Sequence, residues 1–282
     1  MTHRVVVGFD GSPGALVAVS WAAGEARLRG AELVAWTVLD RQESRHVADS
    51  VAAKTPRRSL EESAGGYPVT VRHGYGDAAA ELVAACGDAD LLVVGSRGRG
   101  SLEGLVLGSV SRACLAHAPC PVVVVRPQPE QVPPLGRVIV GVDASEHSRQ
   151  ALRVAAEEAR LRGAVLHVLH AVYWDNAIGL LAPTRKQLVE WGRKLVLAEL
   201  AATGVTGRPV VVPGHASEVL VRHSTHADLL VVGSRGRNPA TGLLLGSTSE
   251  HCARHAHCPV MVNRARYPKP SGRAHVVVHG VV

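Results

Sequence analysis

The stretch RVVVGFDGSPGALVAVSWAAGEARLRGAEL occupies residues 4–33, and a close copy of it, RVIVGVDASEHSRQALRVAAEEARLRGAVL, occupies residues 137–166. Both begin with a short aliphatic run, which is typical of a buried strand. In the first copy, Ser12 and Pro13 suit the N-cap and first turn of a helix, and Gly30 suits its C-cap. Each stretch therefore predicts a strand followed by a helix.

The likeness between the two copies continues along the chain. DADLLVVGSRGRG at residues 88–100 matches HADLLVVGSRGRN at residues 226–238, and residues 114–126 match residues 252–264. The offset grows from 133 to 138 positions, so the second copy carries five extra residues in its middle. A repeat unit this long is a duplicated domain rather than a solenoid repeat.

We therefore expect two domains joined by a proline-rich linker. A length of 282 residues agrees with two domains of ordinary size. The expected boundaries are residues 1–128 for the first domain, 129–136 for the linker, 137–266 for the second domain and 267–282 for a C-terminal tail. The tail, with AHVVVHGVV, reads either as one more short strand or as disordered chain.

Strands and helices alternate through each copy. Beyond the opening strand and helix, the first copy has expected strands at 31–40, 68–74, 90–95 and 120–126, and expected helices within 41–66, from Asp77 and over 109–117. Alternation with aliphatic strands predicts an α/β fold. The fold we expect is two tandem doubly wound domains, each with a five-stranded parallel sheet of the Rossmann-like, nucleotide-binding type. Such sheets bind ligands at the carboxyl ends of their strands.

The helix after the second strand is better formed in the second copy, at residues 184–204. Its apolar residues recur at helical spacing, which predicts a stripe that packs on the sheet. The residues of this stripe are Leu188, Trp191, Leu195 and Val196.

A glycine-rich loop follows the fourth expected strand of each copy, with the pattern G-x2-G-x9-G-S in both. Glycine lets backbone N–H groups approach an anion, and a serine at a helix start lies among free N–H groups that favour phosphate. The alternative is that these glycines only build a tight turn. The pattern matches neither the Walker A loop nor the dinucleotide fingerprint. Its residues are Gly95, Gly98, Gly108 and Ser109, repeated as Gly233, Gly236, Gly246 and Ser247.

Arginines accompany the glycines, and they either supply charge to a ligand or are merely solvated. They are Arg97, Arg99, Arg235 and Arg237. The second loop departs from the first at Asn238 and Pro239, where the first has Gly100 and Ser101. Because proline removes an N–H group and stiffens the loop, we expect weaker binding at the second site.

With these loops, the openings VVVGFDGS and VIVGVDAS and the closing runs HAPCPVVVV and HAHCPVMV, the sequence resembles the universal stress protein family in its tandem-domain form. The resemblance extends from about Arg4 to about Arg264. It implies a stress-response regulator that binds ATP in both copies, with or without Mg²⁺. It also implies pairing through the last strands, within the chain or between chains of a homodimer.

The resemblance implies a role for each matching residue. Asp10 and Asp143 would lie against the adenosine, the backbone of Val38 and Ala171 would meet adenine, and Gly95 and Gly233 would lie by the ribose. The phosphates would be bound by Gly98, Gly108 and Ser109, and by Gly236, Gly246 and Ser247. Each aspartate could instead be a helix N-terminal charge or a turn residue.

No catalytic residues are expected. Phosphoryl or nucleotidyl transfer needs placed metal ligands, a base and cationic clamps, whereas each site offers one Asp, hydroxyls and arginines. We therefore expect little or no turnover. The alternatives are a slow ATPase or nucleotidyltransferase, a basic nucleic-acid-binding module, and a ligand-free structural dimer.

Composition argues against nucleic acid as the partner, despite a formal net charge of +7. The basic residues are dispersed, and aromatic residues, which would stack on bases, make up only 3%. No apolar stretch approaches membrane-spanning length, and MTHRVVVGFD does not resemble a signal peptide. Five cysteines without a dense framework suggest a reducing compartment, so we expect a cytoplasmic protein. The sequence does not indicate a downstream protein partner.

A Cys-x2-His-x2-Cys run occurs in both copies, at residues 114–120 and 252–258. It supplies zinc-type donors. However, its first Cys lies on an expected helix and its last at a strand start, so the donors are not expected to converge. Buried packing of the thiols is the favoured interpretation, and no metal site is predicted.

Overall fold

The computed structural model describes residues 3–39, 57–98, 107–127, 134–173, 183–236 and 244–264. The strands of the first copy are β1 (Arg4–Gly8), β2 (Glu32–Leu39), β3 (Val69–Tyr75), β4 (Leu91–Gly95) and β5 (Val122–Val125). Those of the second are β6 (Arg137–Gly141), β7 (Val165–Val172), β8 (Arg208–Pro213), β9 (Leu229–Gly233) and β10 (Val260–Asn263).

The helices alternate with these strands, as the sequence predicts. They are α1 (Pro13–Arg29), α3 (Arg57–Ser63), α4 (Ala78–Ala85) and α5 (Ser109–His117) in the first copy, and α6 (Glu146–Arg162), α7 (Arg185–Thr203), α8 (Ala216–Ser224) and α9 (Ser247–His255) in the second. The expected caps of α1 are confirmed. Ser12 Oγ accepts a hydrogen bond from the N–H of Ala15 at 3.2 Å, and Gly30 ends the helix in the left-handed conformation with φ 59°.

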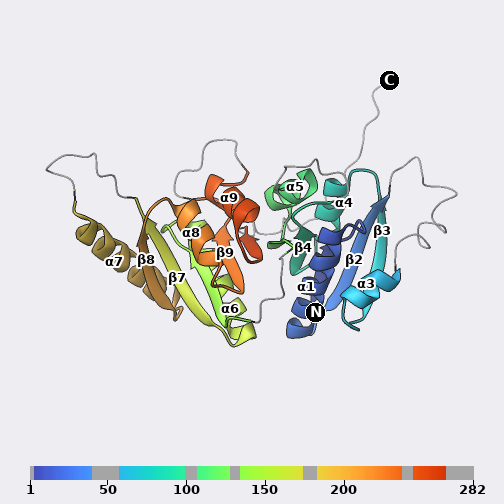
Figure 1. Ribbon diagram of the computed structural model, residues 1–282, viewed down its shortest axis with the longest axis horizontal. Helices are drawn as coiled ribbons and strands as arrows, with labels where there is room; N and C mark the ends of the chain where they lie inside the picture. The colour runs from blue at the N-terminus through green and yellow to red at the C-terminus, as the bar shows by residue number, and fades with distance from the viewer. Residues whose placement is uncertain are drawn as a thin grey trace, which may run out of the picture.

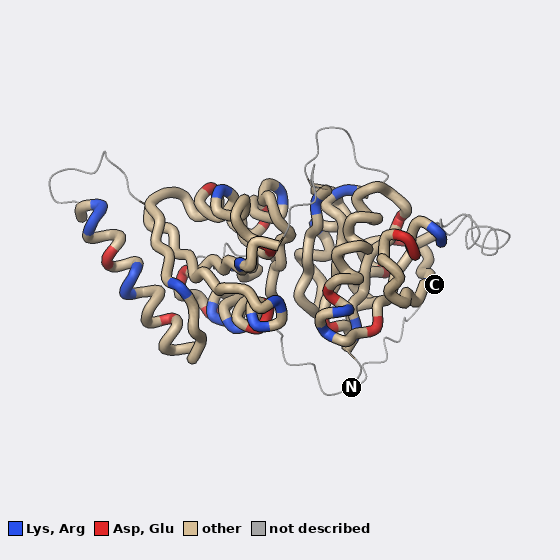
Figure 2. Tube along the Cα trace, turned by 60° about the horizontal axis from the view of Figure 1, so that its bottom comes forward, with Lys and Arg blue, Asp and Glu red and all other residues tan. Residues whose placement is uncertain are grey.

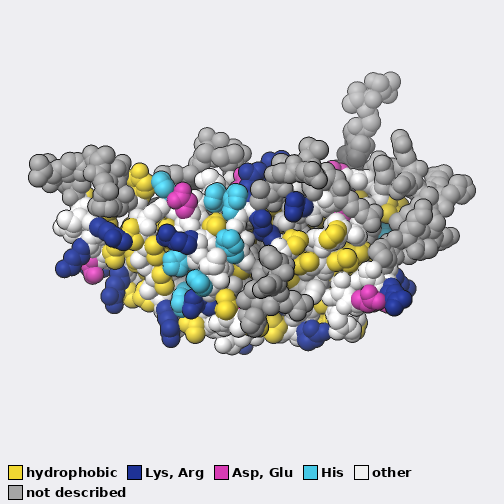
Figure 3. All heavy atoms as spheres, viewed as in Figure 1, with side chains coloured by type: hydrophobic (Ala, Val, Ile, Leu, Met, Phe, Trp, Pro, Cys, Tyr) yellow, Lys and Arg dark blue, Asp and Glu magenta, His cyan; other side chains and the backbone are white. Residues whose placement is uncertain are grey.

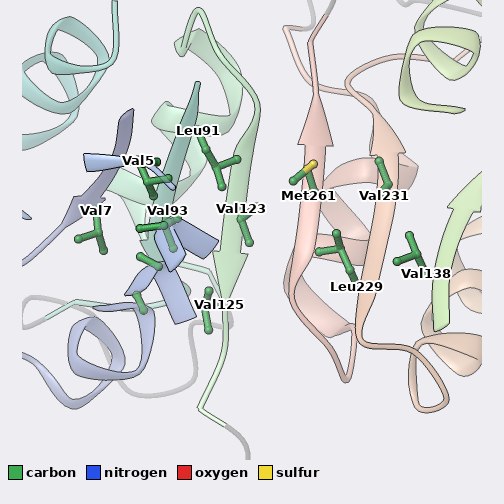
Figure 4. Close-up of a cluster of buried hydrophobic side chains, with 14 of the residues drawn as sticks. Val5, Val7, Leu91, Val93, Val123, Val125, Val138, Leu229, Val231 and Met261 are labelled. Atoms are coloured by element: carbon green, nitrogen blue, oxygen red, sulfur yellow. The ribbon is translucent and has the colours of Figure 1, made fainter. Parts of the chain in front are cut away.

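The ten strands form a single sheet in the order β3-β2-β1-β4-β5-β10-β9-β6-β7-β8. The expected five-stranded parallel arrangement is present in each half, but the halves are not separate sheets. β5 and β10 pair antiparallel, with Val123 opposite Met261, and Figure 4 shows these two residues on the neighbouring strands where the halves meet. The pairing through the last strands is therefore within the chain, and it removes two exposed strand edges at once.

Helices cover both faces of this sheet (Figure 1). One face packs against α1, α3, α6 and α7, which bury residues such as Leu60 and Val196. The other packs against α4, α5, α8 and α9, which bury Leu82, Leu115 and Cys252. None of the helices in the described part of the chain has both the length and the apolar character required to span a bilayer.

The stripe expected on α7 is wrong in one residue. Trp191 is 54% exposed, whereas Gly192, Val196 and Glu199 are the buried residues of this helix. The helix passes so close to the sheet at Gly192 that an added Cβ there would lie 2.7 Å from Val211 Cγ1. This close approach turns α7 so that Trp191 points away from the core.

Candidate functional site

Asp10 and Asp143 follow the first strand of each copy and close an Asx turn. Asp10 Oδ1 accepts a hydrogen bond from the N–H of Ser12 at 2.9 Å, and Asp143 Oδ1 accepts one from Ser145 at 3.0 Å. The second carboxylate oxygen of each faces the glycine loop. A Cβ added at Gly98 would clash with Asp10 Oδ2, and one at Gly236 would lie 2.8 Å from Asp143 Oδ2. Each aspartate therefore takes the turn role and also lies beside the loop.

The glycine loop is anchored identically in the two copies. The N–H of Gly108 donates to Ser96 O at 2.8 Å, and the N–H of Gly246 donates to Ser234 O at 2.7 Å. These bonds bring the first and last residues of each loop together at the carboxyl edge of the sheet. The loop interiors, including Arg99, Arg237, Asn238 and Pro239, lie outside the described residues.

α5 and α9 begin at the ends of these loops, with Gly108 and Gly246 as their N-caps. Glycine has no side chain to accept hydrogen bonds from the first-turn N–H groups, in contrast to Ser12, which caps α1. The first turn that starts at Ser109, and the one that starts at Ser247, therefore direct N–H donors and the positive helix end towards the loop. This geometry suits an anion.

Gly95 and Gly233 have a packing role that the sequence did not indicate. A Cβ at Gly95 would lie 2.9 Å from Gly14 O, and one at Gly233 would lie 2.9 Å from His147 O. Each glycine lets its strand end pass directly against the first turn of α1 or α6. A role towards the ribose stays a prediction for both.

In the second copy, the expected residues line one cleft with a volume of about 180 Å³. Its walls come from the ends of β6, β7 and β9 and from the starts of α8 and α9. All six residues expected there contribute, namely Asp143, Ala171, Gly233, Gly236, Gly246 and Ser247. Leu169 and Leu220 add apolar surface beside Ala171.

In the first copy, a bulky residue replaces one residue that lines this cleft in the second. Val38 lies near the end of β2, in register with Gly74 of β3. Two residues earlier, Trp36 occupies the position of Leu169 in the second copy, and its buried indole Nε1 has no hydrogen-bond partner among the described residues. The position equivalent to Leu169 therefore holds a large aromatic side chain in the first copy.

Three further basic side chains near the two sites were not predicted from the sequence. Two of them, Arg126 and Arg264, occupy equivalent positions of the repeat. Arg126 and Arg264 directly follow β5 and β10, so each copy ends its last strand with arginine. Burial lowers the pKa of Arg126, and Arg97 lowers it further; burial and Arg235 do the same to the pKa of Arg264. His147, which replaces Gly14, also has a pKa lowered by burial and then by Arg235.

The cysteines pack in the core. All five are free and buried, and burial raises the pKa values of Cys114, Cys252 and Cys258 to about 12. Among the described residues, no three His, Cys, Asp or Glu side chains are grouped to hold a metal ion. Cys114, Cys252 and Cys258 therefore stay protonated and pack as small apolar groups, whereas a hydrogen bond with Cys120 lowers the pKa of Cys86.

Comparison with known proteins places this fold and its loops in one family. The family model for the universal stress protein family matches the chain twice, over residues 1–126 and 134–264. The chain belongs to the universal stress protein family.

Relatives in this family match nearly the full length of the chain. Universal stress protein Rv2623 of Mycobacterium tuberculosis is 37% identical over 298 residues, which cover 92% of this chain and 96% of the relative. A universal stress protein of Mycolicibacterium smegmatis is 35% identical, with 94% and 98% covered. A universal stress protein structure from Archaeoglobus fulgidus is similar in fold, with a TM-score of 0.67, 22% identity, and 93% and 96% covered.

Proposed function

We propose that this universal stress protein is a regulatory protein of the stress response that binds ATP at two sites, one in each copy, with little or no turnover. We further propose that the protein is cytoplasmic, because its five free thiols would stay reduced in that compartment. The proposed domain boundaries are those expected from the repeat, with residues 129–136 as the linker.

One observation carries the proposal. Residues from four separate segments of the second copy, each expected from the sequence to touch a nucleotide, line a single cleft. The cleft has an apolar side at Leu169, Ala171 and Leu220, which suits a base, and an N–H-rich side at Gly246 and Ser247, which suits phosphate. Asp143 also lines the cleft, and in the proposal its carboxylate accepts from the ribose hydroxyls.

The residues of each site suit Mg²⁺ only when a nucleotide supplies further oxygen ligands. Proteins usually bind Mg²⁺ through one or two carboxylates together with substrate phosphates. Each site contributes one such carboxylate, Asp10 or Asp143, and the described residues contain no metal-binding group of three or more His, Cys, Asp or Glu. In the proposal, Mg²⁺ therefore binds together with the phosphates of ATP.

Isothermal titration with ATP, in Mg²⁺ and in EDTA, tests the proposal. Asp10→Asn and Asp143→Asn keep an oxygen for the turn hydrogen bond but remove the charge at the loop. We expect two sites in the parent protein, loss of one in each variant, and loss of both in the double variant. Glu190→Gln, on the exposed side of α7, should change nothing. Absence of affinity for any adenine nucleotide in the folded parent protein would contradict the proposal.

A true enzyme is the second candidate function, and His147 is the observation that favours it. Burial lowers the pKa of this imidazole, so it is a neutral base near the second cleft at pH 7. Steady-state ATP turnover near the common value of about 10 s⁻¹ would support the enzyme. Turnover that stays far below this value, in parent protein and in His147→Gly alike, would support the regulator.

A nucleic-acid-binding module and a ligand-free homodimer receive less support from the structure. Figure 2 shows basic and acidic segments mixed over both halves, for example along α7, rather than one basic face for nucleic acid. β5 and β10 already pair within the chain, so a homodimer would have to form through another surface. The outermost strands of the described sheet are β3 and β8, and β8 contains Pro209 and Pro213, which disfavour edge pairing.

A further inference from the structure

Arg126 and Arg264 lie at the carboxyl edge of the sheet, where the glycine loops also begin. In the parallel pairing of β4 with β5, Gly95 lies opposite Val125, and the N–H of Ser96 donates to Val125 O at 2.8 Å. The second copy repeats this pairing, with the N–H of Ser234 donating to Asn263 O at 2.9 Å. Each arginine therefore leaves its strand beside the first residues of a glycine loop.

Three guanidinium groups at this edge each have a buried nitrogen without an acceptor among the described residues. Nη1 of Arg126, Nη1 of Arg264 and Nε of Arg235 are buried and have no hydrogen-bond partner in the described part of the chain. No ion pair to Arg97, Arg126, Arg235 or Arg264 occurs within the described ranges either, although many other arginines there are paired. A buried charged donor without an acceptor is costly, and the described residues of each copy supply no acceptor for these N–H groups.

The nearest charges make this cost larger. Arg97 acts on Arg126, and Arg235 acts on Arg264, so two guanidinium groups approach each other twice in one molecule. In the second copy, Arg235 and Arg264 also lower the pKa of His147, after burial, which is the largest cause. Like charges gathered at a partly buried edge are stabilised by an anion that carries more than one charge.

We propose that each pair, Arg97 with Arg126 and Arg235 with Arg264, binds the terminal phosphates of a nucleotide and so selects nucleoside di- and triphosphates over monophosphates. The inference rests on the proposed nucleotide function and names the ligand class for both sites. The N–H groups at Ser109 and Ser247 take one phosphate, and each arginine pair takes the phosphates beyond it. Guanidinium groups suit this role because they bind phosphate oxygens through two parallel hydrogen bonds.

The test compares ATP, ADP, AMP and inorganic tripolyphosphate by titration calorimetry on the full chain. Arg126→Met with Arg264→Met keeps the aliphatic stems and removes both charges. We expect the affinity for ATP to fall about tenfold or more, which corresponds to one lost charge-assisted interaction, while the affinity for AMP stays within about twofold. Arg153→Met, an exposed arginine on α6, is the matched control and should leave all affinities unchanged.

A second pair of variants keeps the test decisive if the methionine variants do not fold. Arg126→Lys with Arg264→Lys retains the charge but not the two-point geometry, and we expect an intermediate ratio of ATP to AMP affinity. An unchanged ratio in the methionine or the lysine variants would overturn the inference, as would equal affinity for ATP and AMP in the parent protein. Arginine-dependent binding of tripolyphosphate without any adenine nucleotide binding would support the arginine pairs and contradict the nucleotide function.

Discussion

Arg29 of α1 donates a hydrogen bond from Nη2 to Glu158 Oε1 of α6 at 2.6 Å, and so joins the two copies across 129 positions of sequence. Arg162 bonds both Glu25 and Glu158, and Arg29 also contacts Glu25 Oε2 at 2.9 Å. All four side chains are at most 13% exposed. Burial raises the pKa of Glu25, although Arg162 and Arg29 oppose this effect. The cluster connects the domains independently of the β5–β10 pairing.

Removal of one member of this cluster should strongly destabilise the protein. Arg162→Met leaves Glu25 and Glu158 with one cationic partner instead of two in a buried position. We expect the free energy of unfolding to fall by about 3–5 kcal/mol, measured by urea denaturation. Arg160→Met, on the same helix, breaks only an exposed pair with Glu157 and should cost less than about 1 kcal/mol. Equal losses in the two variants would show that burial of the cluster contributes nothing.

The turn after the first strand is strained in the second copy only. Ala144 and its counterpart Gly11 are both left-handed, with φ 65° and φ 74°. Only Ala144 has a Cβ, which makes this conformation unfavourable. A left-handed conformation costs an L-residue about 1–2 kcal/mol, so Ala144→Gly should stabilise the protein by up to about 1 kcal/mol, and Gly11→Ala should destabilise it by about 1 kcal/mol. Thermal unfolding of both variants checks this. Two shifts of the same sign would contradict it.

Histidines gather on the outer side of α8 and α9 (Figure 3). They line a groove of about 620 Å³ together with Arg222, and they are His223, His226, His251 and His257. Burial lowers the pKa of His223, and Arg222, His226 and Arg137 lower it further. The first copy has Ala85 at the position of His223.

This lowered pKa makes stability depend on pH. Below the ordinary value of 6.5, the unfolded chain binds more protons at His223 than the folded protein does, so the free energy of unfolding falls as pH decreases. His223→Ala should therefore lose less stability than the parent protein between pH 7.5 and 5.5, measured by urea denaturation at each pH. Above about pH 6.5 the contribution of His223 is absent. Parallel pH curves for the two proteins would refute this prediction.

His147 should make the second site sensitive to pH. Its pKa is lowered in the free protein by burial, Arg235 and Arg264, and a bound phosphate would favour its protonated form. In the Asp10→Asn background, which reports the second site alone, ATP affinity should rise as pH falls below 6.5. His147→Gly, which restores the residue of the first copy, should weaken this rise in the same titration. An identical pH profile with and without the imidazole would exclude a contact with phosphate.

Within one copy, most of the structure could be predicted from the sequence because it depends on local chemistry. The hydroxyl of Ser12 and the missing Cβ of Gly30 determine where α1 begins and ends, and aliphatic runs mark the strands. The repeated spacing of Gly233, Gly236 and Gly246 singles out three residues that line the cleft of the second copy. The contacts of these residues with a nucleotide remain a prediction.

Other features required the tertiary structure, because they depend on residues far apart in the chain. Trp191 fits a buried helical stripe by spacing alone, but the close approach of Gly192 to Val211 turns its side chain outwards. Arg126 looks like an ordinary residue after a strand until the pairing of β4 with β5 places it beside the loop.

By itself, the sequence determined the duplication, the alternation of strands and helices and the place of the glycine loops, since propensity, capping and spacing act over a few residues. Only the tertiary structure decided that Val123 pairs with Met261 in one continuous sheet and that Arg29 reaches Glu158. Both contacts join segments more than 125 residues apart. Such contacts depend on which strand edges and which buried charges meet once the two domains are folded.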